Sequence, residues 1–205
     1  MAARAAGKGL AALAATLLLL VWGAGAMAQD LPARFTVAGV AAGDVLNVRA
    51  APSASARILG TLAPGDTGVE IVRLSPDGRW GLMPLREGSG WVSMRYLARE
   101  APSPTPLPRP LLCRGTEPFW SLTLDTRGAR FERMGEGAIP LRQHGEVAGF
   151  RGGVAAFDAG GETLDLTVIR QACSDGMSDR PYGFTALVWN RGELFLEGCC
   201  ALSAR

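Results

Sequence analysis

Prolines occupy every second position from residue 102 to residue 110, within the sequence APSPTPLPRP, and divide this 205-residue chain into two parts. Proline lacks a backbone N–H and fixes φ, so this stretch can enter neither a helix nor the centre of a sheet. The composition predicts a semi-rigid, extended linker over residues 101–110, with a reach of up to roughly 30 Å. Two folded modules are then expected, at residues 29–100 and 111–205. A second interpretation is that PLPRP is itself a ligand for a groove that recognises polyproline helices.

The first 28 residues have the three parts of a secretory signal peptide. Arg4 and Lys8 precede an apolar run over residues 10–21, and an Ala-Met-Ala cleavage site ends at residue 28. The apolar run is short for a membrane span, and no cysteine follows the cleavage site, so neither a transmembrane nor a lipid anchor is indicated. We therefore expect a periplasmic or secreted protein with no stable membrane anchor after cleavage.

The charge of the mature chain bears on its partners. Cleavage removes Arg4 and Lys8 from the 21 basic residues and none of the 19 acidic residues. The mature chain then carries equal numbers of the two kinds. Because proteins that bind nucleic acid rely on excess positive charge, this balance predicts no nucleic-acid partner.

The first module reads as short strands that are broken by Gly, Pro and Asp turns, without helical periodicity. The predicted strands cover residues 34–40, 44–48, 58–62, 67–74, 79–83 and 90–92. So short a segment buries a core only if its sheet curls into a small barrel. The apolar residues available for that core are Val37, Val40, Leu46, Val48, Ile58, Leu59, Leu62, Val69, Ile71, Val72, Leu82, Val92 and Leu97.

Several motifs follow one another in this module: LNVRAAPS at 46–53, LG at 59–60, GD at 65–66, DGRW at 77–80 and GWVSMRYL at 90–97. Together they resemble the bacterial SH3 (SH3b) family over nearly the whole module. The resemblance implies an SH3-like barrel that serves as a binding module for peptidoglycan or for an envelope protein. The short loop at residues 85–89 departs from the enlarged wall-binding versions of this fold.

Five residues of the first module are candidates for ligand binding. Trp80 and Tyr96 either line a shallow groove, where aromatic side chains give contact area at little entropic cost, or pack in the core of the module. Trp91 either contributes to this groove or packs within its strand. Asn47 and Arg49 alternate with apolar neighbours and are the polar positions expected to orient a peptide, although a solvated sheet edge has the same pattern.

The second module also alternates short strands with Gly-containing turns. Strands are predicted at residues 120–126, 129–132, 139–142, 147–151, 154–158, 163–170, 184–189 and 193–196. A module of this size and pattern predicts an antiparallel β-barrel or sandwich. The fold class of the whole chain is therefore all-β: a small SH3-like barrel joined by a Pro-rich linker to a second, disulfide-bonded barrel or sandwich.

Three motifs distinguish the second module: CRGTEPFW at 113–120, CSDGMSD at 173–179 and GCC at 198–200. They resemble a family of uncharacterised bacterial envelope proteins, which are sometimes fused to SH3-like or lysozyme-inhibitor-like modules. The resemblance implies no established activity, so no catalytic residue is carried over. Glu117, Trp120, Asp175 and Asp179 lie within these motifs and form the candidate surface of this module.

All four cysteines lie in the second module, which predicts two disulfides in an exported protein. Cys199 and Cys200 are adjacent and would point to opposite faces of a strand, so they should reach different partners. We favour Cys173 with Cys199 and Cys113 with Cys200, since the second bridge would tie the first and last strands. The swapped pairing remains open at this point.

Other chemistry has weak support in the sequence. A zinc site lacks the Cys-x-x-Cys spacing, and a calcium loop at 175–179 has too few oxygen ligands. His144 is the only histidine, and it is remote from Cys173, so a nucleophile with its base is not evident. Glu117 with Asp175 or Asp179 offers an acid–base pair, although DG is ordinary turn chemistry. We predict no metal, no cofactor and no catalytic residue.

These observations predict an exported binding or adaptor protein of the cell envelope rather than an enzyme. One alternative is an inhibitor of lysozyme-like wall hydrolases, with residues 174–182 as the loop that enters the cleft of the hydrolase. Another is a cell-wall hydrolase or transferase, which the lack of a nucleophile with its base makes the weakest of the three.

Overall fold

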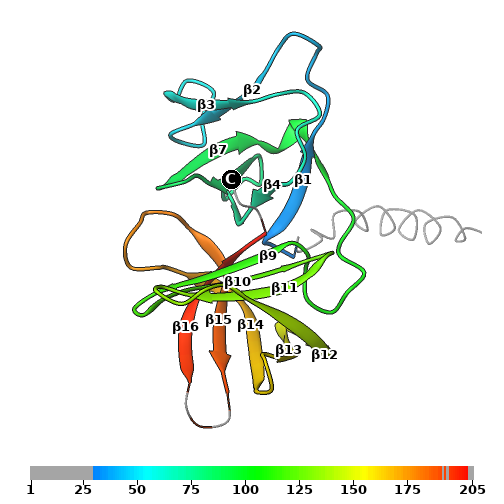
Figure 1. The fold of residues 1–205 in the computed structure, drawn as a ribbon. Helices are drawn as coiled ribbons and strands as arrows, with labels where there is room; N and C mark the ends of the chain where they lie inside the picture. The colour runs from blue at the N-terminus through cyan, green and yellow to red at the C-terminus, as the bar shows by residue number, and fades with distance from the viewer. Residues whose placement is uncertain (1–29, 191, 193, 203–205) are drawn as a thin grey trace, which may run out of the picture. The chain divides into compact units, whose positions relative to one another are not determined.

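The computed structural model describes residues 30–190, 192 and 194–202, and the chain from Leu31 onward forms one compact unit (Figure 1). The expected signal peptide at residues 1–28 lies outside the described residues. The described part of the chain is all-β, as predicted. None of its segments is a helix with the length and hydropathy needed to cross a membrane.

The first module consists of two small antiparallel sheets. One has the strand order β4 (Val69–Ile71), β1 (Ala33–Val37) and β8 (Leu97–Arg99). The other has the order β3 (Ile58–Leu62), β2 (Leu46–Arg49), β7 (Ser89–Ser93), β6 (Trp80–Pro84) and β5 (Arg73–Leu74). A 3₁₀ turn, η1 (Met94–Tyr96), joins β7 to β8.

The core of the first module contains most of the predicted apolar residues. Its buried members are Ala33, Phe35, Val37, Leu46, Val48, Leu62, Val69, Ile71, Met83 and Val92. The prediction was wrong for Ile58 and Leu59, which are 50% and 37% exposed. Both lie on β3, which is an edge strand of its sheet and leaves four of its five residues exposed.

The second module is a closed antiparallel barrel (Figure 1). Its strands are β9 (Leu111–Thr116), β10 (Phe119–Asp125), β11 (Gly128–Arg133), β12 (Ile139–Gly149), β13 (Gly152–Asp158), β14 (Thr163–Cys173), β15 (Tyr182–Trp189) and β16 (Phe195–Ala201). The barrel closes where β16 pairs with β9. Successive residues alternate between the interior and the outer wall, as in Leu164, Leu166 and Val168 of β14, which are all buried.

The prolines of the linker region stay out of the sheets, but the second half of this region belongs to the barrel. Leu107 is 1% exposed and is part of the barrel core. Gly153 of β13 makes room for it, because a Cβ on Gly153 would lie only 2.9 Å from Cδ2 of Leu107. The range 101–110 is therefore not a free spacer throughout. Burial of the Leu107 side chain in the barrel is more favourable than its exposure to water.

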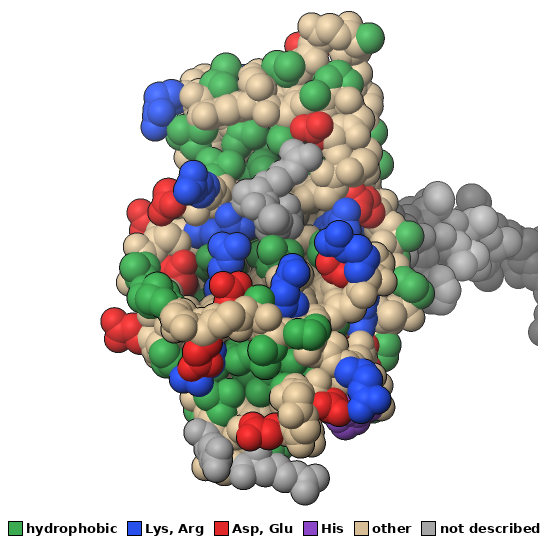
Figure 2. Space-filling model, viewed as in Figure 1, with side chains coloured by type: hydrophobic (Ala, Val, Ile, Leu, Met, Phe, Trp, Pro, Cys, Tyr) green, Lys and Arg blue, Asp and Glu red, His purple; other side chains and the backbone are tan. Residues whose placement is uncertain are grey.

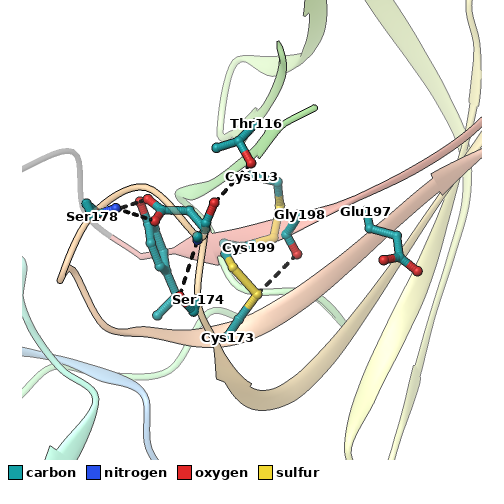
Figure 3. The surroundings of a disulfide bond; sticks show 12 residues. Cys113, Thr116, Cys173, Ser174, Ser178, Glu197, Gly198 and Cys199 are labelled. Carbon is teal, nitrogen blue, oxygen red and sulfur yellow. Dashed lines mark hydrogen bonds between the residues drawn. A yellow bond between two sulfur atoms is a disulfide. The ribbon is translucent and has the colours of Figure 1, made fainter. Parts of the chain in front are cut away.

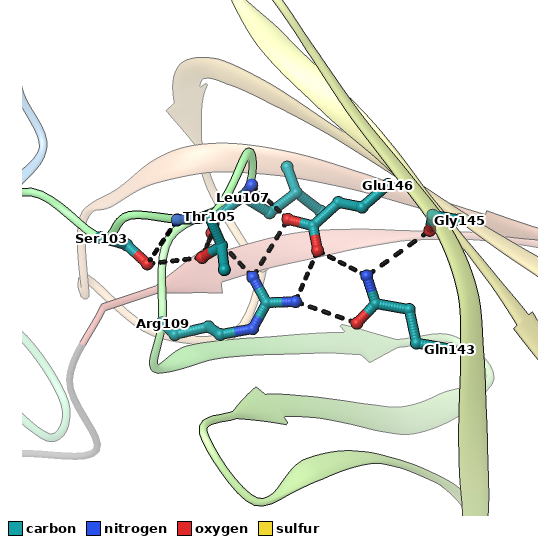
Figure 4. A network of polar contacts seen from close by, with 7 residues as sticks. All are labelled: Ser103, Thr105, Leu107, Arg109, Gln143, Gly145 and Glu146. Atoms are coloured by element: carbon teal, nitrogen blue, oxygen red, sulfur yellow. Dashed lines mark hydrogen bonds and ion pairs between the residues drawn. The ribbon is translucent and has the colours of Figure 1, made fainter.

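A buried ion pair fixes this segment to the barrel (Figure 4). The Arg109 guanidinium pairs with the Glu146 carboxylate, and their side chains are 10% and 8% exposed. Arg109 also donates to Gln143 Oε1 at 3.0 Å, and the backbone N–H of Leu107 donates to Glu146. We call residues 103–110, with Leu107 and Arg109 at their centre, the strap.

We predict that Leu107→Ala lowers the free energy of unfolding of the barrel by about 2–4 kcal/mol, because it leaves a cavity in a closed core. Chemical denaturation of the intact protein, followed by barrel-specific NMR signals, measures this loss. Leu59→Ala is the matched control, since Leu59 is partly exposed on an edge strand. Equal small losses from the two variants would show that Leu107 is not a core residue.

A few hydrogen bonds connect the first module with the barrel. Arg180 donates from Nη1 to the carbonyl oxygen of Leu85 at 2.9 Å, and Arg170 donates to the carbonyl oxygen of Pro32 at 3.3 Å. Each module has its own apolar core. Independent folding of the two modules stays a prediction.

Candidate functional site

The outer face of the five-stranded sheet carries a row of side chains that contains one residue from each strand. In order they are Ile58, Arg49, Trp91, Leu82 and Arg73, and each is the cross-strand partner of the next. The Arg73 guanidinium lies 5.9 Å from the centre of the Trp91 ring. Leu82 is 6% exposed without belonging to the core cluster, which fits cover by its neighbours Trp91 and Arg73. We call these five residues the Trp91 row.

Trp80 and Asn47 extend the Trp91 row. Trp80 lies two residues before Leu82 on β6 and opposite Ser93, which makes it a diagonal neighbour of Trp91 on the same face. Asn47 lies two residues before Arg49 on β2, also on this face. Both tryptophans are half-buried. This face therefore combines two indole rings with two guanidinium groups.

A polar turn fixes the start of the Trp80 strand. The Ser75 hydroxyl donates to Asp77 Oδ1 at 2.5 Å and accepts the backbone N–H of Trp80 at 3.0 Å. Arg79 donates from Nε to the other Asp77 oxygen at 2.6 Å. The hydrogen bond from Ser75, and then those from Arg79, lower the pKa of Asp77 to about 2. Asp77 is therefore charged at neutral pH and holds the turn that begins β6.

Tyr96 is not on the five-stranded sheet. It sits in η1 and packs against the core cluster of the module, and the Arg95 guanidinium lies 5.6 Å from the centre of its ring. Cross-strand pairing thus brings Trp80 together with Trp91, whereas the sequence had grouped Trp80 with Tyr96. The alternation of β2 does place Asn47 and Arg49 on the outer face, as predicted.

The motif residues of the barrel divide between its interior and its outer wall. Cys113 and Cys200 face each other across β9 and β16 and form a disulfide inside the core. Cys173 and Cys199 form the second disulfide. The favoured pairing is confirmed, and the adjacent cysteines do point to opposite faces.

The prediction that Trp120 belongs to the surface of the second module was wrong. This residue is 4% exposed in the barrel core, where its Nε1 donates to the carbonyl oxygen of Glu197 at 3.1 Å. Two glycines make space for the indole: a Cβ on Gly115 would collide with Nε1, and one on Gly198 would lie 2.7 Å from Cζ2. The CRGTEPFW and GCC motifs therefore meet at one packing site and serve the fold.

The CSDGMSD motif begins with Cys173, the last residue of β14, and continues as a loop beside the Cys173–Cys199 disulfide (Figure 3). Thr116 donates its hydroxyl proton to the carbonyl oxygen of Asp175 at 2.9 Å, which connects the loop to β9. The Asp175 carboxylate accepts the backbone N–H groups of Met177 and Ser178 and the hydroxyls of Ser178 and Tyr182. The loop at 174–181 is thus tied to the barrel at several points.

The candidate acid–base residues lie in different settings. Asp175 is occupied by the loop, while Glu117 and Asp179 are exposed, Glu117 in the turn between β9 and β10. His144 is exposed at a bulge of β12. Among the residues that the structure describes, no group of three or more His, Cys, Asp or Glu side chains is placed to hold a metal ion.

The pKa of Asp175 leads to a prediction. Burial raises this pKa, but hydrogen bonds from Ser178, Met177 and Tyr182 outweigh burial and hold it below its ordinary value. A carboxylate whose pKa is lowered by folding stabilises the folded state above its unfolded pKa and loses that contribution as the pH falls through its folded pKa. We expect faster amide exchange in the loop, relative to the barrel strands, as the pH falls below about 4. Asp175→Asn should remove this pH dependence, and a loop that stays equally protected in acid would contradict the assignment.

An open groove of about 630 Å³ lies beside this loop. Its exposed apolar side chains are Phe119, Met134 and Met177, which are 41%, 73% and 69% exposed. Arg114, Thr116 and Tyr182 add polar groups to its walls. The sequence motifs pointed to this part of the barrel, but Met134 and Phe119 were not predicted as surface residues, because apolar side chains next to turns carry no signal of exposure.

Charged side chains of both signs are mixed on the face of the protein shown in Figure 2. This mixture agrees with the composition of residues 29–205, in which basic and acidic residues are equal in number. The described residues of that face form no large patch of basic side chains of the kind that would attract a polyanion.

Comparison with known proteins identifies one part of the chain. Residues 44–98 match the family described as bacterial SH3 domain. No curated protein and no solved structure matches the chain. Strand β1 lies outside the matched range, although it pairs with both β4 and β8. The matched range includes the whole Trp91 row together with Trp80 and Asn47, so the candidate surface belongs to a bacterial SH3 domain.

Proposed function

We propose that the protein is a binding or adaptor protein of the bacterial cell envelope that acts in the periplasm or outside the cell, without catalytic activity. A bacterial SH3 domain suggests a module that binds the cell wall or a protein. Two disulfides are consistent with an extracytoplasmic protein, because such bonds persist in oxidising compartments.

The Trp91 row is the observation that carries the proposal. Its indole ring offers an apolar platform, and Arg49 and Arg73 lie on opposite sides of it, one strand and two strands away. Arg49 donates from Nη1 to the carbonyl oxygen of Ala56 at 2.8 Å, which orients its guanidinium. Guanidinium groups bind carboxylates in two-point geometry, and tryptophan contributes much of the binding energy at interfaces.

This chemistry favours a peptide that carries carboxylates beside small apolar side chains. Strands in a sheet are about 4.8 Å apart, so the backbones of Arg49 and Arg73 lie on the order of 14 Å from each other, while the Arg73 side chain reaches back over the Trp91 ring. An extended peptide of about four to five residues covers that distance. Cell-wall peptides of peptidoglycan, or an acidic segment of an envelope protein, meet these requirements.

Pull-down of the intact protein on purified peptidoglycan sacculi tests the proposal. Trp91→Ala and Arg73→Gln should each weaken binding by on the order of 1–3 kcal/mol, because Trp91 lies on the central strand and the Arg73 guanidinium lies over its ring. Trp189→Ala and Arg127→Gln are the matched controls, because both residues are exposed on the barrel. Binding that the two row variants leave intact would remove the Trp91 row as the site. Absence of any binding to sacculi would direct the search to a protein partner.

The two alternatives make different use of the barrel. An inhibitor of lysozyme-like hydrolases was expected to present residues 174–182 as a plug, but Asp175 and Thr116 tie this loop to the barrel. Met177 is the large apolar side chain that the loop exposes. A wall hydrolase or transferase needs an acid–base pair, and the Asp175 carboxylate is already bound by four donors. Assays of lysozyme inhibition and of wall digestion separate these alternatives from binding alone.

A further inference from the structure

The two ends of the barrel differ. In an antiparallel barrel of consecutive hairpins, alternate turns lie at the same end. The end that holds the β12–β13 turn is closed by the strap, whose Leu107 packs against Gly153. At the other end, a cavity of about 450 Å³ is lined by the turns after β11 and β13 and by Asn190 and Leu194. We call this cavity the open mouth.

Apolar side chains that face the barrel interior form the floor of the open mouth. Phe131 and Leu164 are 5% and 4% exposed and line the cavity from β11 and β14. Ile139 is the cross-strand partner of Phe131 and so shares its face, yet it is 41% exposed. Leu194 adds to the apolar wall. The described chain thus leaves inward-facing apolar surface uncovered at this end.

Charged groups stand at the rim of the open mouth. The Arg133 guanidinium forms an ion pair with the Glu136 carboxylate, with 3.1 Å between Nη1 and Oε1. Glu162 lies in the turn between β13 and β14 and also lines the cavity. Among the described residues its carboxylate has neither an ion-pair partner nor a side-chain hydrogen bond. The charged side chains of the described lining are therefore one cation and two anions, and the unpaired charge is negative.

We propose that the open mouth binds a small amphiphilic molecule with a cationic head, of the class of a protonated amine on an aryl or alkyl body. The apolar body occupies the floor over Phe131, Leu164 and Ile139, and the ammonium group pairs with Glu162 at the rim. Mouths of β-barrels are common sites for such ligands, because the interior supplies apolar contact and the rim supplies a few polar groups. This inference concerns the barrel and is independent of the Trp91 row.

Three isosteric probes test the site by NMR titration of the intact protein: phenylpropylamine, phenylpropanol and phenylpropanoate. The amine should shift amide signals of the turns around Glu136, Glu162 and Leu194 and bind about 3- to 10-fold more tightly than the alcohol. The carboxylate should bind most weakly, because Glu162 repels it. Preferred binding of the carboxylate, or no binding of any probe at this end, would overturn the proposal.

Two variants locate the binding. Glu162→Gln should abolish the preference for the amine over the alcohol, whereas Glu132→Gln, on the exposed outer side of β11, should leave it unchanged. Ile139→Trp fills the floor and should weaken all three probes at least about tenfold, with the remaining barrel signals in place. An amine preference that survives Glu162→Gln, or binding that survives Ile139→Trp, would place the ligand elsewhere and overturn the assignment. Since Glu162 is exposed, its variant remains informative even if Ile139→Trp fails to fold.

Discussion

Replacement of Trp120 with alanine is expected to lower the free energy of unfolding of the barrel by about 3–5 kcal/mol. The indole is almost fully buried, and the variant also leaves the Glu197 carbonyl without its donor. The space left behind cannot close easily, since Gly115 and Gly198 have no side chains that could move into it. Loss of packing and loss of a buried hydrogen bond therefore act together.

Denaturant titration with NMR or fluorescence detection measures the effect of Trp120→Ala. Trp189→Ala is the control, because Trp189 is 39% exposed on the outer wall and its loss should cost less than about 1 kcal/mol. Trp120→Phe should fall between the two, since it retains ring contact but not the N–H donor. If Trp120→Ala lowers the free energy of unfolding no more than Trp189→Ala does, Trp120 is not a core residue.

Removal of the Cys113–Cys200 disulfide is expected to destabilise the barrel by about 4–5 kcal/mol, and removal of Cys173–Cys199 by about 3–4 kcal/mol. The difference follows from the length of chain that each disulfide closes into a loop. The cysteines are 87 residues apart in Cys113–Cys200 and 26 residues apart in Cys173–Cys199. In the chain-entropy model, a longer loop restricts the unfolded chain more strongly. The Cys113–Cys200 bridge also connects the two strands that close the barrel.

Paired alanine variants, one for each disulfide, separate the two contributions in denaturant titrations. The first module contains no cysteine, so reduction should leave protection of its strands from amide exchange almost unchanged. A larger loss from the Cys173 and Cys199 pair would contradict the ranking. Simultaneous loss of protection in both modules would show that they unfold as one unit.

Alternation and turn chemistry were sufficient to predict the all-β class and most strands, and they favoured the disulfide pairing that the structure confirms without excluding the swapped one. Cys199 and Cys200 had to point to opposite faces because successive side chains in a strand do so. Strand β9 was missed, since CRGT reads as a polar motif and its Gly115 serves Trp120 rather than a turn. Strand β12 was predicted as two strands, because a bulge between Gln143 and Gly145 interrupts its alternation.

The sites were harder to predict than the fold, because they depend on register and on tertiary packing. Asn47, Arg49, Trp80 and Trp91 were candidates from the sequence, but Arg73 was not, and Ile58 and Leu82 were expected in the core. The grouping of Trp80 with Trp91 required the pairing of β6 with β7. The sequence around Leu107 is rich in proline and gave no indication that this residue is buried. The strap could be identified only from the contact between Leu107 and Glu146, which lies 39 residues further along the chain. Trp120 was assigned to the surface because it lies in one of the distinctive motifs, beside polar residues. The open mouth involves side chains from three separate turns, which no local pattern connects.

The disulfides are nested, because the first cysteine in the chain pairs with the last and encloses the pair between them. A chain that enters an oxidising compartment from its N-terminus exposes Cys113 and Cys173 long before Cys200 arrives. A bond between these two would have to be exchanged, through attack by a thiolate and a mixed disulfide, before the barrel can close. If the Cys113–Cys173 bond forms first, the native pairing is reached only by disulfide isomerisation as well as oxidation, and a refolding buffer for this protein should then supply both.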